Sequence, residues 1–150
     1  MDSEVVVSAF QDDSLGSDDA IVIAEKIKQG ELDTKTVNRD AIKRAELVNP
    51  KLNAIAVENF DLAQANSENT FSGFFQGVPT FIKDTDEVPG LPLYVGSRSL
   101  PGEPSEKFSK AAKQIIDTGL NCLGTSTTPE FGLTGTTESM RFGATCNPWN

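Results

Sequence analysis

Apolar side chains recur at the period of an α-helix in the first third of the chain. A helix is predicted over about 18–29, where two aspartates suit the N-terminus electrostatically and Gly30 offers a left-handed stop. A second helix is predicted from a cap at Asp33 or Thr34. Asn49-Pro50 should end it, because the residue before a proline avoids helical backbone angles. Two antiparallel helices are therefore expected ahead of the first strand.

Short β-rich runs alternate with helical patterns in the rest of the chain. Strands are predicted over 52–57, 78–82 and 120–123, and helices from Glu58 to Asn69 and from Pro104-Ser105 to Gly119. Strand, loop, helix and strand between residues 78 and 123 form a βαβ unit. The sequence therefore predicts an α/β fold in which at least part of the sheet is parallel.

The two ends of the chain differ from this pattern. Residues 1–17 are polar and acidic, and we interpret them as a flexible N-terminal arm ahead of one domain over 18–150. Residues 124–139 are rich in hydroxyl groups and glycine, which is typical of loops that present backbone N–H groups to a ligand. A solvated loop that satisfies its own backbone has the same composition, and both interpretations stay open.

Composition narrows the classes of function. At 150 residues the chain has material for one modest core, and a formal charge of −9 opposes binding to nucleic acid or anionic lipid. The apolar runs are short, and the first fifteen residues lack the basic and apolar regions of a secretory signal. We therefore expect a cytoplasmic protein that binds neither nucleic acid nor membrane.

The chain contains no histidine, which excludes Ser-His-Asp and Cys-His catalysis within it and removes the commonest neutral zinc ligand. Cys122 and Cys146 are too far apart for a CxxC pair and are interpreted as reduced thiols. Asp84 and Asp86 lack the spacing and glycine of a calcium loop and are interpreted as turn formers. No metal and no cofactor are predicted.

Lys83 is the candidate for acid-base chemistry, because it directly follows a predicted buried strand. Packing of its stem would partly desolvate the amine, and desolvation lowers the pKa of a lysine. A neutral amine can accept a proton from a hydroxyl nucleophile. The alternative is an ordinary strand-end lysine that points to water and pairs with Asp84 or Asp86.

The strand that ends at Lys83 reads Gly77-Val78-Pro79-Thr80-Phe81-Ile82-Lys83-Asp84. This segment is similar to the strand that carries the catalytic lysine in the amidase signature family, and several further segments resemble motifs of that family, in the order in which the family has them. The others are Gly30-Glu31-Leu32, Asn49 to Ala54, Gly90-Leu91-Pro92 with Gly96-Ser97, Leu123-Gly124, Thr128 to Gly132, Thr137-Glu138-Ser139, Phe142 to Thr145 and Asn147-Pro148-Trp149-Asn150. Together they cover about residues 20–150.

The resemblance implies the N-terminal part of a single amidase domain, with a mixed sheet surrounded by helices. It implies hydrolysis of a carboxamide C–N bond by a Ser-cisSer-Lys triad in which Lys83 is the lysine. Both serines are expected beyond Asn150, so we expect residues 1–150 alone to be inactive, and neither Ser97, Ser126 nor Ser139 is assigned as nucleophile. Phe131, Gly132 and Leu133 correspond by position to a segment that borders the acyl pocket, and are predicted to contact a small-molecule amide.

Two departures from the family pattern concern the substrate. Thr85 stands where asparagine is common, and Ser126-Thr127-Thr128 stands where Thr-Asn-Met is frequent. Two alternatives remain open: a glutamine-dependent amidotransferase A-type subunit with the same triad, and a noncatalytic binding domain on the same scaffold. A homodimer of the complete enzyme is also left open.

Overall fold

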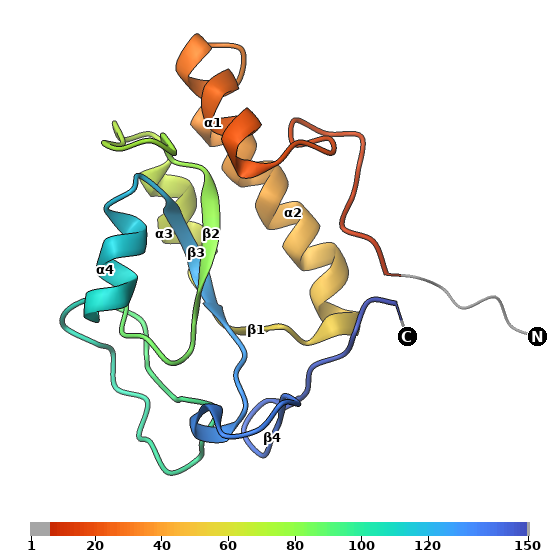
Figure 1. Cartoon of the computed structure of the whole chain (residues 1–150), viewed down its shortest axis with the longest axis vertical. Helices are drawn as coiled ribbons and strands as arrows, with labels where there is room; N and C mark the ends of the chain where they lie inside the picture. The colour runs from red at the N-terminus through yellow and green to blue at the C-terminus, as the bar shows by residue number, and fades with distance from the viewer. Residues whose placement is uncertain (1–6, 150) are drawn as a thin grey trace, which may run out of the picture.

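The structure is a computed structural model that describes residues 7–149 (Figure 1). Its helices are α1 (Ala20–Gln29), α2 (Thr34–Leu52), α3 (Phe60–Asn66) and α4 (Lys110–Ile116), with a short 3-10 helix η1 (Glu130–Gly132). Its strands are β1 (Ile55–Glu58), β2 (Pro79–Lys83), β3 (Asn121–Ser126), β4 (Glu138–Ser139) and β5 (Gly143–Ala144). In the described part of the chain no helix is long and apolar enough to cross a bilayer.

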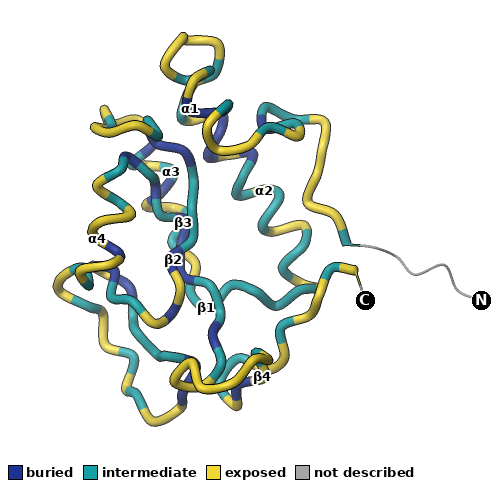
Figure 2. The backbone as a smooth tube through the Cα atoms, viewed as in Figure 1, coloured by how far each residue is buried: buried dark blue, intermediate teal, exposed yellow. Residues whose placement is uncertain are grey.

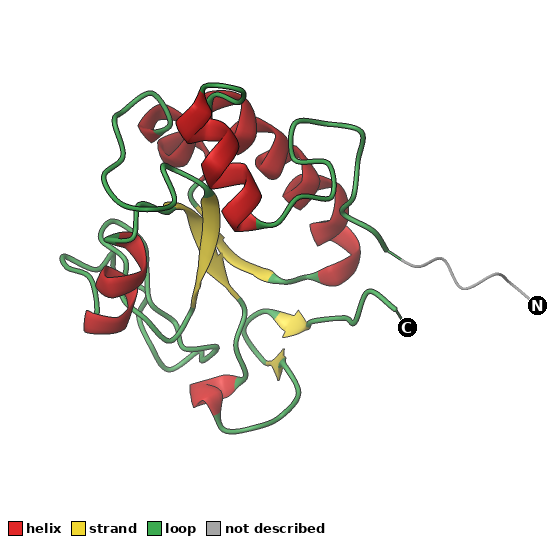
Figure 3. Ribbon diagram, turned by 45° about the horizontal axis from the view of Figure 1, so that its top comes forward, coloured by secondary structure: helices red, strands yellow, loops and turns green. Residues whose placement is uncertain are grey.

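The predicted α/β fold with a mixed sheet is confirmed. The three-stranded sheet has the order β1-β3-β2, in which β2 is parallel and β1 antiparallel to β3. Helix α4 connects β2 to β3, so the predicted βαβ unit is confirmed as well. Figure 3 shows the strands at the centre with helices around them. Because β2 and β3 are parallel, their C-terminal ends and the loops that follow lie at one edge of the sheet.

Two apolar clusters hold the helices to the sheet. One joins α1 and α2 to the start of β2 and includes Val37 and Val78. The other joins β2 to α4 and includes Ile82 and Ala112, whose side chains are buried. In Figure 2 buried segments follow β3, whereas most of β2 is of intermediate burial. Burial of about 25 cal/mol per Å² of apolar surface makes these clusters the main stabilising term.

Helix α1 forms as predicted, because its signals are local. The side chain of Asp19 accepts hydrogen bonds from two N–H groups of the first turn, and Gly30 takes the left-handed conformation with φ of 77°. Glycine adopts this conformation without the steric penalty that a Cβ would bring. Both ends of the helix are therefore fixed by residues next to it in the sequence.

Helix α2 does not end where the proline predicts. It continues through Pro50 to Leu52, so the prediction that Asn49-Pro50 stops it is wrong. The missing N–H of Pro50 falls in the last turn, where other groups compensate: Asn53 donates its N–H to the backbone oxygen of Asn49 at 2.7 Å. The side chain of Asn49 also accepts the N–H of Ala54 at 2.8 Å. These bonds offset the cost of a proline inside the helix.

Helix α4 begins at Lys110, later than the predicted start at Pro104-Ser105. Ser109 is its N-cap, and its hydroxyl accepts a hydrogen bond from the first turn. Pro104 and Ser105 instead form isolated β-bridges with the loop at residues 89–92. The predicted helix start is wrong because a contact between two loops holds Pro104 and Ser105 in an extended conformation. The local sequence pattern does not indicate this contact.

The described part of the predicted N-terminal arm contacts α2. Arg44 donates two hydrogen bonds to the carboxylate of Asp13, from Nε to Oδ2 at 2.8 Å and from Nη2 to Oδ1 at 2.5 Å. Leu15 is buried in the cluster that joins α1 and α2. Residues 1–6 of the predicted arm lie outside the described residues. Residues 11–16 are thus attached to the domain by one ion pair and one apolar anchor.

This ion pair makes the stability of the chain depend on pH. The hydrogen bond from Arg44 holds the pKa of Asp13 below its ordinary value, which is about 3.9 in an unfolded chain. A carboxylate with a lowered folded pKa stabilises the protein above the unfolded value and loses this contribution as pH falls through the folded one. Asp13→Asn is therefore expected to lower the free energy of unfolding by about 1 kcal/mol at pH 7 and to have a vanishing effect in strong acid.

Urea unfolding of the wild type and of Asp13→Asn, at neutral pH and at a pH below the pKa of Asp13, measures this difference in the free energy of unfolding. Asp12→Asn is the matched control, because Asp12 is exposed and forms no ion pair within residues 7–149. A difference between wild type and Asp13→Asn that stays constant or grows toward low pH would contradict the assignment.

Candidate active site

Lys83 is the last residue of β2, and in the parallel register it lies opposite Ser126, the last residue of β3. Side chains alternate between the two faces of a strand. Ile82 is buried in the cluster with α4, so Lys83 shares the other face with Phe81. The sequence therefore predicted correctly that Lys83 ends a strand which leads into a loop at the edge of the sheet.

The expected burial of Lys83 is wrong, because the residue is exposed. Ile82, the residue before it, is buried in the cluster with α4, and the alternation turns Lys83 away from that core. The sequence pattern identifies an apolar strand. It does not show which face of the strand packs against α4, and so whether the last residue, Lys83, is buried. The described part of the molecule therefore does not bury Lys83 as the neighbouring apolar residues led us to expect.

The alternative pairing of Lys83 with the following aspartates is also absent. Among residues 7–149 no carboxylate lies within 4.0 Å of its Nζ. Asp84 is fully buried, and its carboxylate accepts the N–H groups of Tyr94 and Gly96, both at 3.0 Å. Asp86 accepts the hydroxyl of Ser109 at 2.6 Å. The amine of Lys83 is thus left without an ionic partner beside it.

Two loops meet at this edge of the sheet, one at residues 84–97 and the other at 127–133. The N–H of Phe131 donates to the backbone oxygen of Val95 at 2.9 Å, and both residues have positive φ, 52° and 49°. A Cβ on Gly96 would lie 2.5 Å from the backbone oxygen of Thr128, so only glycine fits between the loops. The loop after the lysine strand therefore sets the position of the loop after β3.

The predicted substrate contacts lie on the second loop. Phe131 and Gly132 belong to η1 and Leu133 follows it, and all three are exposed. The apolar side chains of Phe131 and Leu133 keep 49% and 81% of their accessible surface. Such exposure leaves them free to contact an apolar group. The structure places their loop at the edge of the sheet that carries Lys83. The hydrogen bond from Phe131 to Val95, in the loop that follows Lys83, holds it there.

The contacts among four residues of this region, Tyr94, Ser97, Glu130 and Arg141, were not recognised from the sequence. The hydroxyl of Ser97, which is 1% exposed, donates to Glu130 Oε1 at 2.5 Å. Arg141 donates to the backbone oxygen of Ser97 at 2.6 Å, and its guanidinium lies 3.8 Å from the centre of the Tyr94 ring. The local sequence pattern carries no signal for these contacts, because they join the segment 94–97 to residues 130 and 141, which are distant in sequence.

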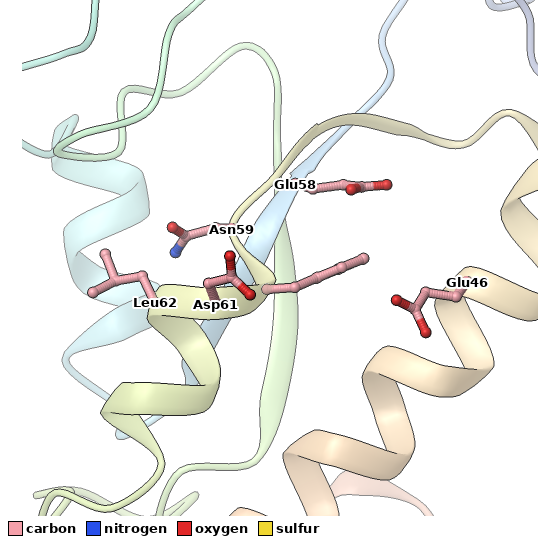
Figure 4. A pocket seen from close by; sticks show the side chains of 6 residues that line it. Glu46, Glu58, Asn59, Asp61 and Leu62 are labelled. Atoms are coloured by element: carbon pink, nitrogen blue, oxygen red, sulfur yellow. The ribbon is translucent and has the colours of Figure 1, made fainter.

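A separate cavity of about 470 Å³ lies between α2 and the start of α3, and Figure 4 shows the side chains around it. Three carboxylates line it, those of Glu46, Glu58 and Asp61. Glu58 pairs with Gly124 in the middle of β3, whereas Lys83 pairs with Ser126 at its end, so this cavity is at a different place on the sheet. Within residues 7–149 no group of three ligating side chains could hold a metal.

Neither cysteine offers an activated thiol at the site. Both are free, and Cys146 is exposed. Burial raises the pKa of the Cys122 thiol, which opposes formation of the thiolate. Lys83 is therefore the residue of this edge that could exchange a proton with a bound substrate or a hydroxyl group.

Comparison with known proteins decides the family. The family model described as Amidase matches residues 37–150. The chain belongs to the amidase signature family. It is 40% identical over 146 residues to AmiC of Mycobacterium tuberculosis, and the aligned region covers 96% of this chain and 31% of AmiC. This amidase signature chain therefore spans about a third of the length of that relative.

Solved structures of the family share the fold. A 6-aminohexanoate cyclic dimer hydrolase complexed with substrate superposes with a TM-score of 0.82 and 32% identity, over 89% of this chain and 28% of that one. A bacterial aryl acylamidase of the amidase signature family has a TM-score of 0.79 and 27% identity, over 89% and 30% of the two chains. The architecture described above is thus that of the N-terminal portion of amidase signature enzymes.

Proposed function

We propose that the protein to which this chain belongs hydrolyses carboxamides, with Lys83 as the base of a Ser-cisSer-Lys triad. The observation that carries the proposal is the position of Lys83 at the end of β2, opposite the end of β3, with no carboxylate within ion-pair distance among the described residues. An amine paired with a carboxylate would be held in its charged form and could not accept a proton.

In the proposed mechanism, neutral Lys83 accepts the proton of the cis-serine hydroxyl. The cis-serine accepts the proton of the nucleophilic serine as the oxygen of that serine attacks the amide carbon. The proton then passes to the leaving nitrogen, the C–N bond breaks and an acyl-enzyme forms. Water hydrolyses this ester to release the acid. Both serines are proposed to lie in the portion of the relatives that this chain does not cover.

The exposure of Lys83 adds a requirement to this mechanism. A neutral lysine near neutral pH needs desolvation of the amine. The described residues do not supply it, since Lys83 is exposed. We propose that the covering surface comes from the same uncovered portion that carries the serines, so that the base is assembled only in the complete domain.

We further propose that the acyl group of the substrate contacts Phe131, Gly132 and Leu133. The exposed apolar side chains of Phe131 and Leu133 support an apolar acyl group of small or medium size, in a linear or cyclic amide. The structural relative bound to its substrate is a hydrolase of the 6-aminohexanoate cyclic dimer. The exposed positions of these residues beside the loop that follows Lys83 make them accessible to such a group.

The experiment is an amide screen with a protein in which this chain is continuous with the rest of an amidase signature domain. A linear carboxamide, an aryl acylamide, a cyclic amide dimer and glutamine are offered, and released amine or ammonia is measured. Hydrolysis of an amide other than glutamine, absent in Lys83→Ala, is the expected result. Hydrolysis of glutamine alone would favour the amidotransferase subunit, and no hydrolysis of any amide would favour a noncatalytic domain.

A further inference from the structure

The carboxylate of Asp84 is fully buried, yet no cation lies within 4.0 Å of it among residues 7–149. Burial of a carboxylate without a countercharge is costly unless hydrogen bonds compensate it. Here the compensation comes from the backbone N–H groups of Tyr94 and Gly96, both at 3.0 Å. The side chain of Asp84, the residue directly after the proposed base, therefore holds the loop at residues 94–96.

The main chain of Asp84 holds a second element. Its N–H donates to the backbone oxygen of Ser126 at 3.0 Å, which continues the pairing of β2 with β3 beyond Lys83. Lys83 is thus flanked by a bonded neighbour and fixed in register against the end of β3. One residue joins the end of the lysine strand, the end of β3 and the loop at 94–96.

The loop at 94–96 in turn fixes the proposed substrate segment. Val95 accepts the N–H of Phe131 at 2.9 Å, and Gly96 lies directly against the backbone of Thr128. Ser97 adds a hydrogen bond from its hydroxyl to Glu130, the neighbour of Phe131, at 2.5 Å. A continuous set of bonds therefore leads from Asp84 to the segment that we propose contacts the acyl group.

We infer that Asp84 is a positioning residue for amide hydrolysis, which fixes the Lys83 amine relative to the substrate segment at Phe131. This inference rests on the proposed function. An alternative is that Asp84 only stabilises the fold. A displacement of a reacting group by about 1 Å can cost about 100-fold in rate, so the two roles differ in their kinetic consequences.

Asp84→Asn is the test in the complete, active enzyme. The amide keeps one acceptor oxygen but turns an NH₂ donor toward one of the two backbone N–H groups, so one bond becomes a repulsive contact. We expect kcat per folded active site to fall by about 100-fold and the acidic limb of the pH profile of kcat to move. The KM should rise as well, because the Phe131 segment is released from the same anchor.

Two further variants separate the effect on Lys83 from the effect on the Phe131 segment. Ser97→Ala removes the bond to Glu130 and the bonds between the Ser97 hydroxyl and Ser99, but leaves the bonds of Asp84 in place. It should therefore raise KM and leave kcat and its pH profile close to wild type. Asp86→Asn is the matched control: Asp86 accepts the hydroxyl of Ser109 at the start of α4 and does not contact the loop at 94–96. If Asp84→Asn does not fold, Asp84→Glu keeps the charge but displaces the acceptor, and the same loss of kcat is expected in milder form.

The outcomes distinguish the inference from the function on which it rests. Active wild type, inactive Lys83→Ala and an Asp84→Asn variant with unchanged kcat, KM and pH profile per folded site would overturn the positioning role alone. Loss of folded protein with normal kinetics in the remainder would assign Asp84 to stability and also overturn it. Full activity of Lys83→Ala would overturn the proposed function instead.

Discussion

Replacing Lys83 by alanine is expected to lower kcat for amide hydrolysis by about 10³- to 10⁴-fold, the upper range for loss of a general base. The reason is that the chain contains no histidine and that Lys83 has no carboxylate within ion-pair distance in the described residues. KM should change far less, because the proposed substrate contacts are on the loop at 131–133. Steady-state kinetics of the complete enzyme, with a substrate identified by the amide screen, provides the measurement.

Lys83→Arg tests whether proton transfer or positive charge matters. A guanidinium keeps the charge but cannot be deprotonated in a protein, so this variant should be as inactive as alanine. Lys110→Ala is the control, since Lys110 is an exposed lysine in the first turn of α4. Substantial activity in Lys83→Arg would show that the residue acts through its charge and would remove the base from the mechanism.

Replacing Asn121 by alanine is expected to destabilise the chain by about 2–4 kcal/mol, because it removes two buried hydrogen bonds and leaves the Oδ1 of Asn38 without that donor. Asn121 is 3% exposed. Its Nδ2 donates to the Oδ1 of Asn38 and to the backbone oxygen of Ala63, each at 2.8 Å. Asn38, also buried, donates onward to the backbone oxygens of Thr34 and Gly77, each at 2.9 Å.

These two asparagines connect four segments through their amide groups: α2, α3, β3 and Gly77, two residues before β2. Asn121→Asp should destabilise more than alanine, since it places an oxygen against both acceptors. Asn69→Ala is the control, because Asn69 is exposed and, among residues 7–149, its side chain forms one hydrogen bond, to Asn66, that is 3.5 Å long. Urea unfolding measures the differences, and a loss below about 0.5 kcal/mol for Asn121→Ala would contradict the network's importance.

The elements that could be predicted are those whose signals are local. Helix α1 has its cap at Asp19 and its stop at Gly30 within the sequence it occupies. The βαβ unit follows from the order of apolar runs, because a parallel pair joined by a helix is the common way to bury them. The same locality explains why Lys83 was correctly assigned to a strand end.

The misassigned boundaries share a physical cause. The end of α2 depends on the Asn49 side chain, which accepts from residues beyond the helix and offsets the effect of Pro50. The start of α4 depends on bridges between residues 104–105 and 89–92. In both cases specific hydrogen bonds, from a side chain near the end of α2 and between two loops before α4, outweigh a propensity of about 1 kcal/mol or more.

The sequence by itself determined the fold class, the family and the residue types available for chemistry: one lysine at a strand end, and no histidine. Only the tertiary structure decided the environment of that lysine and the partners of Asp84, because both depend on segments distant in sequence. Alternation along β2 directs Ile82 to α4 and leaves Lys83 exposed, while the loops at 94–97 and 128–131 meet through backbone contacts. A sequence pattern indicates which segments are apolar. The packing of distant elements decides which face of β2 is covered and which groups form hydrogen bonds with Asp84.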